Sequence, residues 1–151
     1  MNPNYTAEEV IANFQALIAS QDFAIQLRQL GIGPLQIMRR KQMLLEFKAL
    51  FIALWRLALA RSFPDDGQDI FDAYLQTHST DVAKSTNIVQ VAERARQYAD
   101  MLSLRGDTDF SEVSRHLLSF LKLAENERRS ITLKLALDIR QMYNFIFERM
   151  I

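Results

Sequence analysis

The stretch Ala49-Leu50-Phe51-Ile52-Ala53-Leu54-Trp55-Arg56-Leu57-Ala58-Leu59-Ala60 is apolar on nearly every side of a helix. A surface helix keeps one polar face, so a helix of this composition must be surrounded by other elements. The run is shorter than the roughly 20 apolar residues of a membrane span, and it contains Arg56. We therefore expect no membrane span, and we predict a helical bundle around a central hydrophobic helix at about residues 34–61.

Length and composition place the chain among ordinary globular proteins. Its 151 residues suit one domain with a sizeable core, and 49% of them are hydrophobic. Four glycines and three prolines are few, which favours long helices. No stretch alternates between apolar and polar residues as a strand does. We predict one all-α domain over residues 1–151, a single compact bundle of five to seven helices.

Charge and cysteine content exclude several classes of function. Eighteen basic residues balance eighteen acidic ones, so no overall field favours nucleic acid. Residues 81–88 begin like a helix-turn-helix, but Glu93 occupies a position that the motif buries, so we expect no nucleic-acid partner. The absence of cysteine excludes disulfides and thiolate chemistry, and the N-terminus lacks the features of a secretory signal. We expect a cytoplasmic protein.

Local signals mark the first helices. Thr6 and Glu9 have the spacing of a capping box. Apolar spacing then predicts a helix that is interrupted at residues 20–22, resumes to Leu30 and ends at the capping position of Gly31. Pro34 is favourable at the first position of the central helix.

The second half of the sequence predicts further amphipathic helices. Their apolar stripes cover residues 66–77, 88–102, 110–124 and 131–150. Residues 82–86 form either the first turns of the helix at 88–102 or a separate short helix. Gly106 ends the helix at 88–102. Asp109 and Glu112 repeat the capping-box spacing. The last two stripes could form one continuous helix, but it would be about 60 Å long, so we predict a break near Asn126.

Catalytic, metal and cofactor motifs are missing from the sequence. His78 and His116 are the only histidines, and protein metal ligands come in sets. The acidic run 107–111 opens like a calcium loop but lacks its glycine and its final glutamate. No nucleophile motif or glycine-rich phosphate loop occurs. We expect no catalytic residue, no metal and no cofactor, and an enzyme of unknown reaction ranks third among the functions.

A basic cluster follows the Gly31-Ile32-Gly33-Pro34 turn. Arg28 precedes this turn, and Arg39, Arg40 and Lys41 follow it. Free N–H groups at a helix N-terminus together with cations suit an anion, so these four residues form a candidate anion site. The alternatives are a solvated basic face or pairing with the aspartates between Asp65 and Asp72.

Arg56 is the most unusual residue of the central helix. Because an unpaired buried charge is costly, Arg56 must extend to solvent, pair with a buried acid or face a cavity. The last alternative predicts a pocket for a small apolar or anionic ligand near Trp55, Arg56, Tyr74 and His78. A helical ligand-binding sensor is therefore the second function that we consider.

The C-terminal helix is apolar on more than one side. Phe145, Phe147 and Ile151 can fill the core or contact a twofold partner, and homodimers are the commonest oligomers. The first-ranked function is a non-catalytic helical module for protein–protein interaction or regulation, which forms a homodimer or binds another protein.

Overall fold

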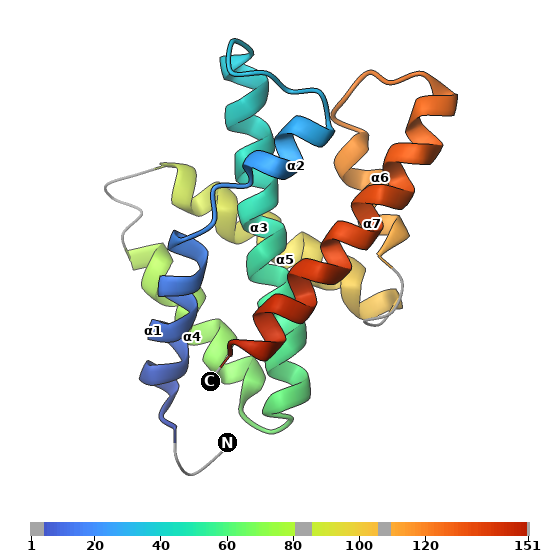
Figure 1. Cartoon of the computed structure of the whole chain (residues 1–151). Helices are drawn as coiled ribbons and strands as arrows, with labels where there is room; N and C mark the ends of the chain where they lie inside the picture. Colours follow the sequence, from blue (N-terminus) through green and yellow to red (C-terminus); the bar gives the residue numbers. More distant parts are fainter. Residues whose placement is uncertain (1–4, 81–85, 106–109, 151) are drawn as a thin grey trace.

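The chain folds into an all-α bundle. The computed structural model describes the backbone of residues 5–80, 86–105 and 110–150, and the side chains of these ranges except 78–80, 86–89 and 104–105. The described residues form seven helices, which confirms the predicted fold class and helix number (Figure 1). They are α1 (Ala7–Ala19), α2 (Ala24–Gln29), α3 (Ile37–Ser62), α4 (Gly67–Thr80), α5 (Thr86–Arg105), α6 (Ser111–Leu118) and α7 (Glu125–Glu148).

The long helix α3 is the centre of the bundle, as its apolar sequence predicts. Helices α1, α4, α5 and α7 all pack against it, and its pairing with α5 is the most extensive (Figure 1). Over its 26 residues it is about 39 Å long. Every residue from Ala49 to Trp55 is buried, so two turns of this helix are surrounded on all sides. In the described ranges, no helix combines the length and apolar character needed to cross a membrane.

The predicted start of the central helix at Pro34 is wrong. Pro34 and Leu35 lie in a turn, and the helix begins at Ile37. The backbone N–H of Gln36 donates a hydrogen bond of 3.2 Å to the carbonyl of Gly33, and Gln36 has non-helical dihedral angles. A proline satisfies the first position of a helix and that of a turn equally well, so the sequence alone does not separate them.

Two predicted helix ends are confirmed in atomic detail. The hydroxyl of Thr6 accepts a hydrogen bond from the N–H of Glu9, whose carboxylate accepts one from the N–H of Thr6, both at 3.2 Å. Gly31 has a φ of 73°. The N–H groups of Gly31 and Ile32 donate to the carbonyls of Arg28 and Leu27, each at 3.0 Å, which is the hydrogen-bond pattern of a Schellman cap.

The predicted interruption after the first helix is present, since α1 ends at Ala19 and α2 begins at Ala24. Phe23 has a φ of 57°, a conformation that costs a non-glycine residue roughly 1–2 kcal/mol. The Asp22 carboxylate accepts a hydrogen bond of 3.0 Å from the N–H of Ala24, which starts α2. The ring of Phe23 stacks on Phe47 at 5.7 Å between centroids and meets Phe51 edge-on. Burial of this ring offsets the backbone strain.

The predicted break between the last two helices is present, but it begins earlier. Helix α6 ends at Leu118, and α7 starts at Glu125, one residue before Asn126. The guanidinium of Arg128 donates to the carbonyl of Leu118, the last residue of α6, and to that of Leu121 in the following connection, each at 3.4 Å. The predicted signals at residues 82–85, at Gly106 and at Asp109 lie outside the described residues.

Candidate functional site

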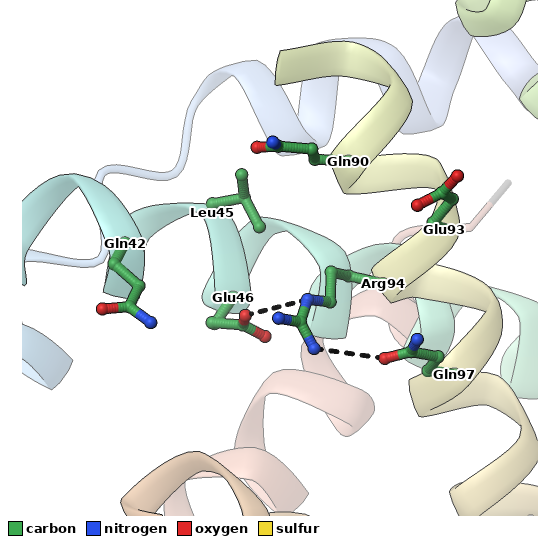
Figure 2. A pocket seen from close by; sticks show the side chains of 7 residues that line it. All are labelled: Gln42, Leu45, Glu46, Gln90, Glu93, Arg94 and Gln97. Carbon is green, nitrogen blue, oxygen red and sulfur yellow. Dashed lines mark hydrogen bonds and ion pairs between the residues drawn. The ribbon is translucent and has the colours of Figure 1, made fainter. Parts of the chain in front are cut away.

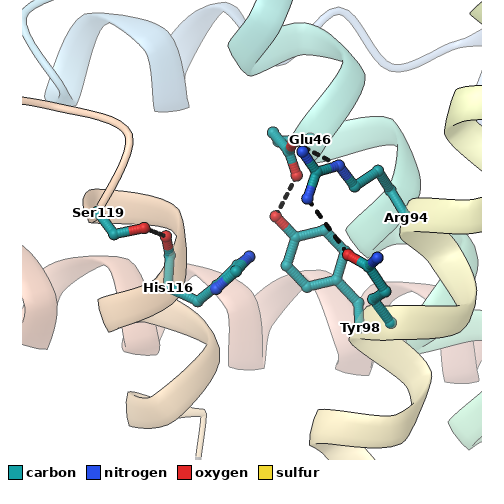
Figure 3. A network of polar contacts seen from close by, with 6 residues as sticks. Glu46, Arg94, Tyr98, His116 and Ser119 are labelled. Atoms are coloured by element: carbon teal, nitrogen blue, oxygen red, sulfur yellow. Dashed lines mark hydrogen bonds and ion pairs between the residues drawn. The ribbon is translucent and has the colours of Figure 1, made fainter.

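The structure places one carboxylate inside the interface between α3 and α5. Glu46 of α3 is only 1% exposed. Its carboxylate accepts a hydrogen bond from the hydroxyl of Tyr98, and it forms an ion pair of 3.2 Å with Nε of Arg94, both from α5 (Figure 3). A buried charge is tolerated when it is paired and hydrogen-bonded. Both conditions are met here, so Glu46 is a fixed anchor between the two helices.

Aromatic contacts extend this network to α6. The ring of His116 meets the ring of Tyr98 edge-on at 5.5 Å and that of Phe120 at 5.4 Å (Figure 3). The guanidinium of Arg94 lies 5.5 Å from the centre of the Phe120 ring and also donates to Oε1 of Gln97 at 3.2 Å. Three helices therefore meet around one buried charge. The hydroxyl of Ser119 donates to the carbonyl of His116 at 2.5 Å and helps to end α6.

The environment of Tyr98 keeps its hydroxyl protonated. Burial raises the pKa of the Tyr98 phenol well above its usual value of 10, and the hydrogen bond to Glu46 and its negative charge raise the pKa further. The positive charge of the nearby Arg94 lowers the pKa of Tyr98, but this is the smallest of the effects. The phenol is thus a permanent hydrogen-bond donor at neutral pH and cannot act as a base.

A polar groove opens beside this network. It has a volume of about 480 Å³ and runs between α3 and α5 (Figure 2). Its lining consists mainly of amide and charged side chains, namely Gln42, Leu45, Glu46, Gln90, Glu93, Arg94 and Gln97. Amides both donate and accept hydrogen bonds, so the groove suits a small polar molecule rather than an apolar one. No sequence pattern indicates this groove, because its two walls come from helices far apart in the chain.

The residues of the predicted ligand pocket are only partly brought together. Trp55 and Tyr74 are buried and meet edge-on at 5.1 Å, and Phe14 stacks on Trp55 at 4.1 Å. Burial raises the pKa of Tyr74 above its usual range. These rings pack directly against one another in the core. The side chain of His78 lies outside the described residues.

Arg56 makes polar contacts away from these rings. Its guanidinium donates to Oε1 of Gln68 at 3.0 and 3.2 Å and to the hydroxyl of Ser103 at 3.0 Å. It also lies 5.9 Å from the centre of the Phe71 ring, and the side chain is half-buried. Arg56 therefore connects α3 to α4 and α5 through neutral partners. Of the predicted alternatives, this contact is closest to extension of the side chain toward solvent.

The predicted anion-binding residues surround the turn between α2 and α3. Arg28 lies on α2, and Arg39, Arg40 and Lys41 occupy the first turns of α3. Four exposed aliphatic side chains lie among them: Ile25, Leu35, Ile37 and Met38. We call this surface of four cations and four apolar residues the tip. The sequence indicated its charge, but the exposure of its apolar residues appeared only in the structure.

Two of the predicted interface residues, Phe145 and Phe147, lie in the last turn of α7. Phe145 is half-buried, and the guanidinium of Arg149 covers its ring at 4.0 Å. Phe147 is 43% exposed, and Ile151 lies outside the described residues. In the middle part of the helix, Leu133 and Leu137 are also exposed.

Comparisons with protein-family models, with curated proteins and with solved structures gave no match. In the part of the chain that the structure describes, no group of three or more metal-binding side chains converges.

Proposed function

We propose that this protein is a non-catalytic helical interaction module that forms a homodimer through one exposed face of α7. The observation that carries the proposal is a stripe of exposed residues at alternating spacings of four and three: Leu133, Leu137, Arg140, Asn144 and Phe147. This is the spacing of a helix that packs along another helix. We call this face the α7 stripe.

The stripe is complementary to a second copy of itself. Leu133 and Phe147 are equally far from Arg140 along the helix. An antiparallel copy with its twofold axis near Arg140 therefore places Leu133 against Phe147 at both ends of the contact. Such a reciprocal contact is what a twofold dimer requires. It also buries apolar side chains that the monomer leaves in water.

The state of the buried polar groups supports a role without catalysis. Glu46 is engaged by both Arg94 and Tyr98, and Arg56 is engaged by Gln68 and Ser103. A general base must be able to reach a substrate proton, and the carboxylate of Glu46 is held by its two partners. These groups fix the positions of α3, α4 and α5 and thereby hold α7 on a rigid support.

The dimer is tested by light scattering on a size-exclusion column over a range of concentrations. We expect the natural chain to have twice the monomer mass of 17.5 kDa. The variant Leu133→Asp with Leu137→Asp should be a monomer, because it places two carboxylates in the apolar part of the contact, with position 133 opposite Phe147 of the second copy. The control, Leu35→Asp with Met38→Asp, makes the same kind of change at apolar residues of the tip, which are even more exposed, and should remain a dimer. A natural chain that is monomeric at every concentration contradicts the proposal.

The groove between α3 and α5 supports a second candidate function, a helical sensor for a small polar molecule. Native mass spectrometry of the purified chain tests it directly. A reproducible additional mass that disappears in Gln97→Trp, which fills the groove, supports a bound ligand. A mass equal to the chain alone or to its dimer contradicts it.

A further inference from the structure

The tip presents apolar side chains almost entirely to solvent. Leu35 is 93% exposed and Met38 is 81% exposed, and Ile25 and Ile37 are also more than half exposed. Single exposed apolar residues are common, but three of them within four positions of the chain, at 35, 37 and 38, indicate a docking surface. Leu35, Ile37 and Met38 belong to the turn before α3 and to its first turn, which lies at one end of the bundle (Figure 1), and Ile25 belongs to the neighbouring α2.

The charge of the tip indicates an anionic partner. No acidic residue occurs in the sequence between Asp22 and Glu46, while Arg28, Arg39, Arg40 and Lys41 all lie there. The last three occupy the beginning of α3, where the helix dipole disfavours positive charge. The first turn of α3 contains no acidic residue, and Gln36 makes no capping hydrogen bond with its side chain. Negative groups at this surface would balance both the cations and the helix end.

The shape of the tip favours a lipid surface over an acidic protein. Side chains exposed as fully as Leu35 and Met38 project from the molecule, so a folded partner would need a matching cavity for each of them. A fluid bilayer adapts to projecting apolar groups, and its phosphates lie at the depth of the flanking cations. Basic residues beside apolar anchors are the usual pattern of reversible binding to anionic membranes.

We propose that the tip binds an anionic lipid surface, with Leu35 and Met38 entering the interface and Arg39, Arg40 and Lys41 contacting lipid phosphates. In this mode of binding the tip rests on the membrane surface. This inference is independent of the α7 stripe, which lies on another helix.

Sedimentation with vesicles tests the inference on the full chain. Vesicles of phosphatidylcholine alone are compared with vesicles that contain phosphatidylserine at roughly one part in four, a composition that gives a negative surface potential. We expect the chain to sediment with the anionic vesicles and not with the neutral ones. Raising the salt concentration should release it, because screening weakens the attraction.

Two pairs of substitutions separate the apolar and the electrostatic contributions. Leu35→Ser with Met38→Ser should weaken binding by at least about tenfold, since two apolar anchors are lost. Arg39→Gln with Arg40→Gln should weaken it by roughly fivefold for each charge removed. The matched controls are Leu35→Ile with Met38→Leu, which keeps the anchors, and Arg96→Gln with Arg129→Gln, which removes exposed cations elsewhere. Both controls should bind like the natural chain.

Three results overturn the inference. The first is a chain that sediments with neither kind of vesicle. The second is binding that the tip substitutions leave unchanged while circular dichroism reports an intact helical fold. The third is retention on immobilised polyglutamate without binding to vesicles, which would identify the tip as a docking surface for an acidic protein segment.

Discussion

The hydroxyl of Tyr98 donates a hydrogen bond to the carboxylate of Glu46 within the most extensive helix pair of the bundle, α3 with α5. Both residues are 1% exposed. The carboxylate also forms an ion pair with Arg94, which lines the groove (Figure 2). The central apolar helix therefore carries one charge in its interior, and α5 supplies both groups that hold it.

Removal of the phenol hydroxyl should destabilise the fold. In Tyr98→Phe the ring is kept, but Glu46 loses a buried hydrogen bond to its carboxylate. We expect the free energy of unfolding to fall by about 1–3 kcal/mol, the usual cost of a buried polar group left without a partner. Urea unfolding followed by circular dichroism measures the change.

Tyr5→Phe is the matched control for this prediction. Tyr5 is half-buried at the start of the chain, so loss of its hydroxyl leaves no buried charge without a partner. Its effect should be close to zero. Equal losses in the two variants would mean that the contact with Glu46 does not contribute specifically to stability.

The raised pKa of Tyr98 predicts a loss of stability in alkaline solution. The phenol titrates near pH 10 in the unfolded chain, whereas burial and Glu46 raise its pKa in the folded chain. Above about pH 10 the unfolded state releases the proton and the folded state retains it, so unfolding becomes more favourable as the pH rises. The contribution of Tyr98 to the free energy of unfolding is therefore fully present below the pKa that its phenol has in the unfolded chain, and it is lost as the pH rises above that value.

Urea unfolding at a series of pH values from about 8 to about 11 tests the sign of this effect. The natural chain should lose stability more steeply than Tyr98→Phe. Burial also raises the pKa of Tyr74, but Tyr74 is present in both proteins, so its effect cancels in the comparison. Parallel curves for the two proteins would contradict the prediction.

The fold was predictable because its signals are local. The apolar run around Trp55 requires a surrounded helix, and the capping box at Thr6 and the glycine at position 31 mark helix ends through backbone geometry. The end of α6 has no comparable signal in its own residues. Its carbonyls are satisfied by Arg128 of the next helix, and a contact between two elements does not appear as a pattern in the sequence.

The candidate sites were predictable only where charge alone defines them. The cations of the tip were found from the sequence, but the exposure of Leu35 depends on where α3 begins, and Pro34 suggested an earlier start. In the sequence, Glu46 is only a polar residue within an apolar helix, because the residues that bind it come from α5. Arg56 attracted attention for the same reason, and its partners also come from other helices. Spatial contacts between distant segments are what a single sequence omits.

Close packing at the junction of α3 and α4 leaves no room for a side chain at Gly67. A Cβ atom at this position would lie 2.7 Å from the carbonyl oxygen of Leu59 and 2.9 Å from its carbon. Helix propensity alone would favour alanine by about 1 kcal/mol. The overlap is with backbone, which cannot move aside without shifting α4, so we expect Gly67→Ala to destabilise the fold by roughly 1–3 kcal/mol.

Gly33→Ala is the control for this substitution. A Cβ atom at Gly33 meets no heavy atom within 4 Å, so the same chemical change should cost little. Thermal unfolding of the two variants beside the natural chain compares them. A lower melting temperature for Gly33→Ala than for Gly67→Ala would show that loss of glycine flexibility, and not contact with Leu59, determines the effect.

The proposed dimer places Arg140 opposite its own copy, and this predicts a substitution that strengthens association. Two guanidinium groups near a twofold axis repel each other, whereas leucine at this position would continue the apolar stripe from Leu137. We expect Arg140→Leu to lower the dissociation constant of the dimer by about tenfold or more, from lost repulsion and added apolar burial. Sedimentation-equilibrium analysis measures the constant.

Arg96→Leu makes the same change on an exposed face of α5 and should leave the dissociation constant of the dimer unchanged. If the two variants associate equally, added hydrophobicity alone is responsible, and the α7 stripe is not the dimer contact.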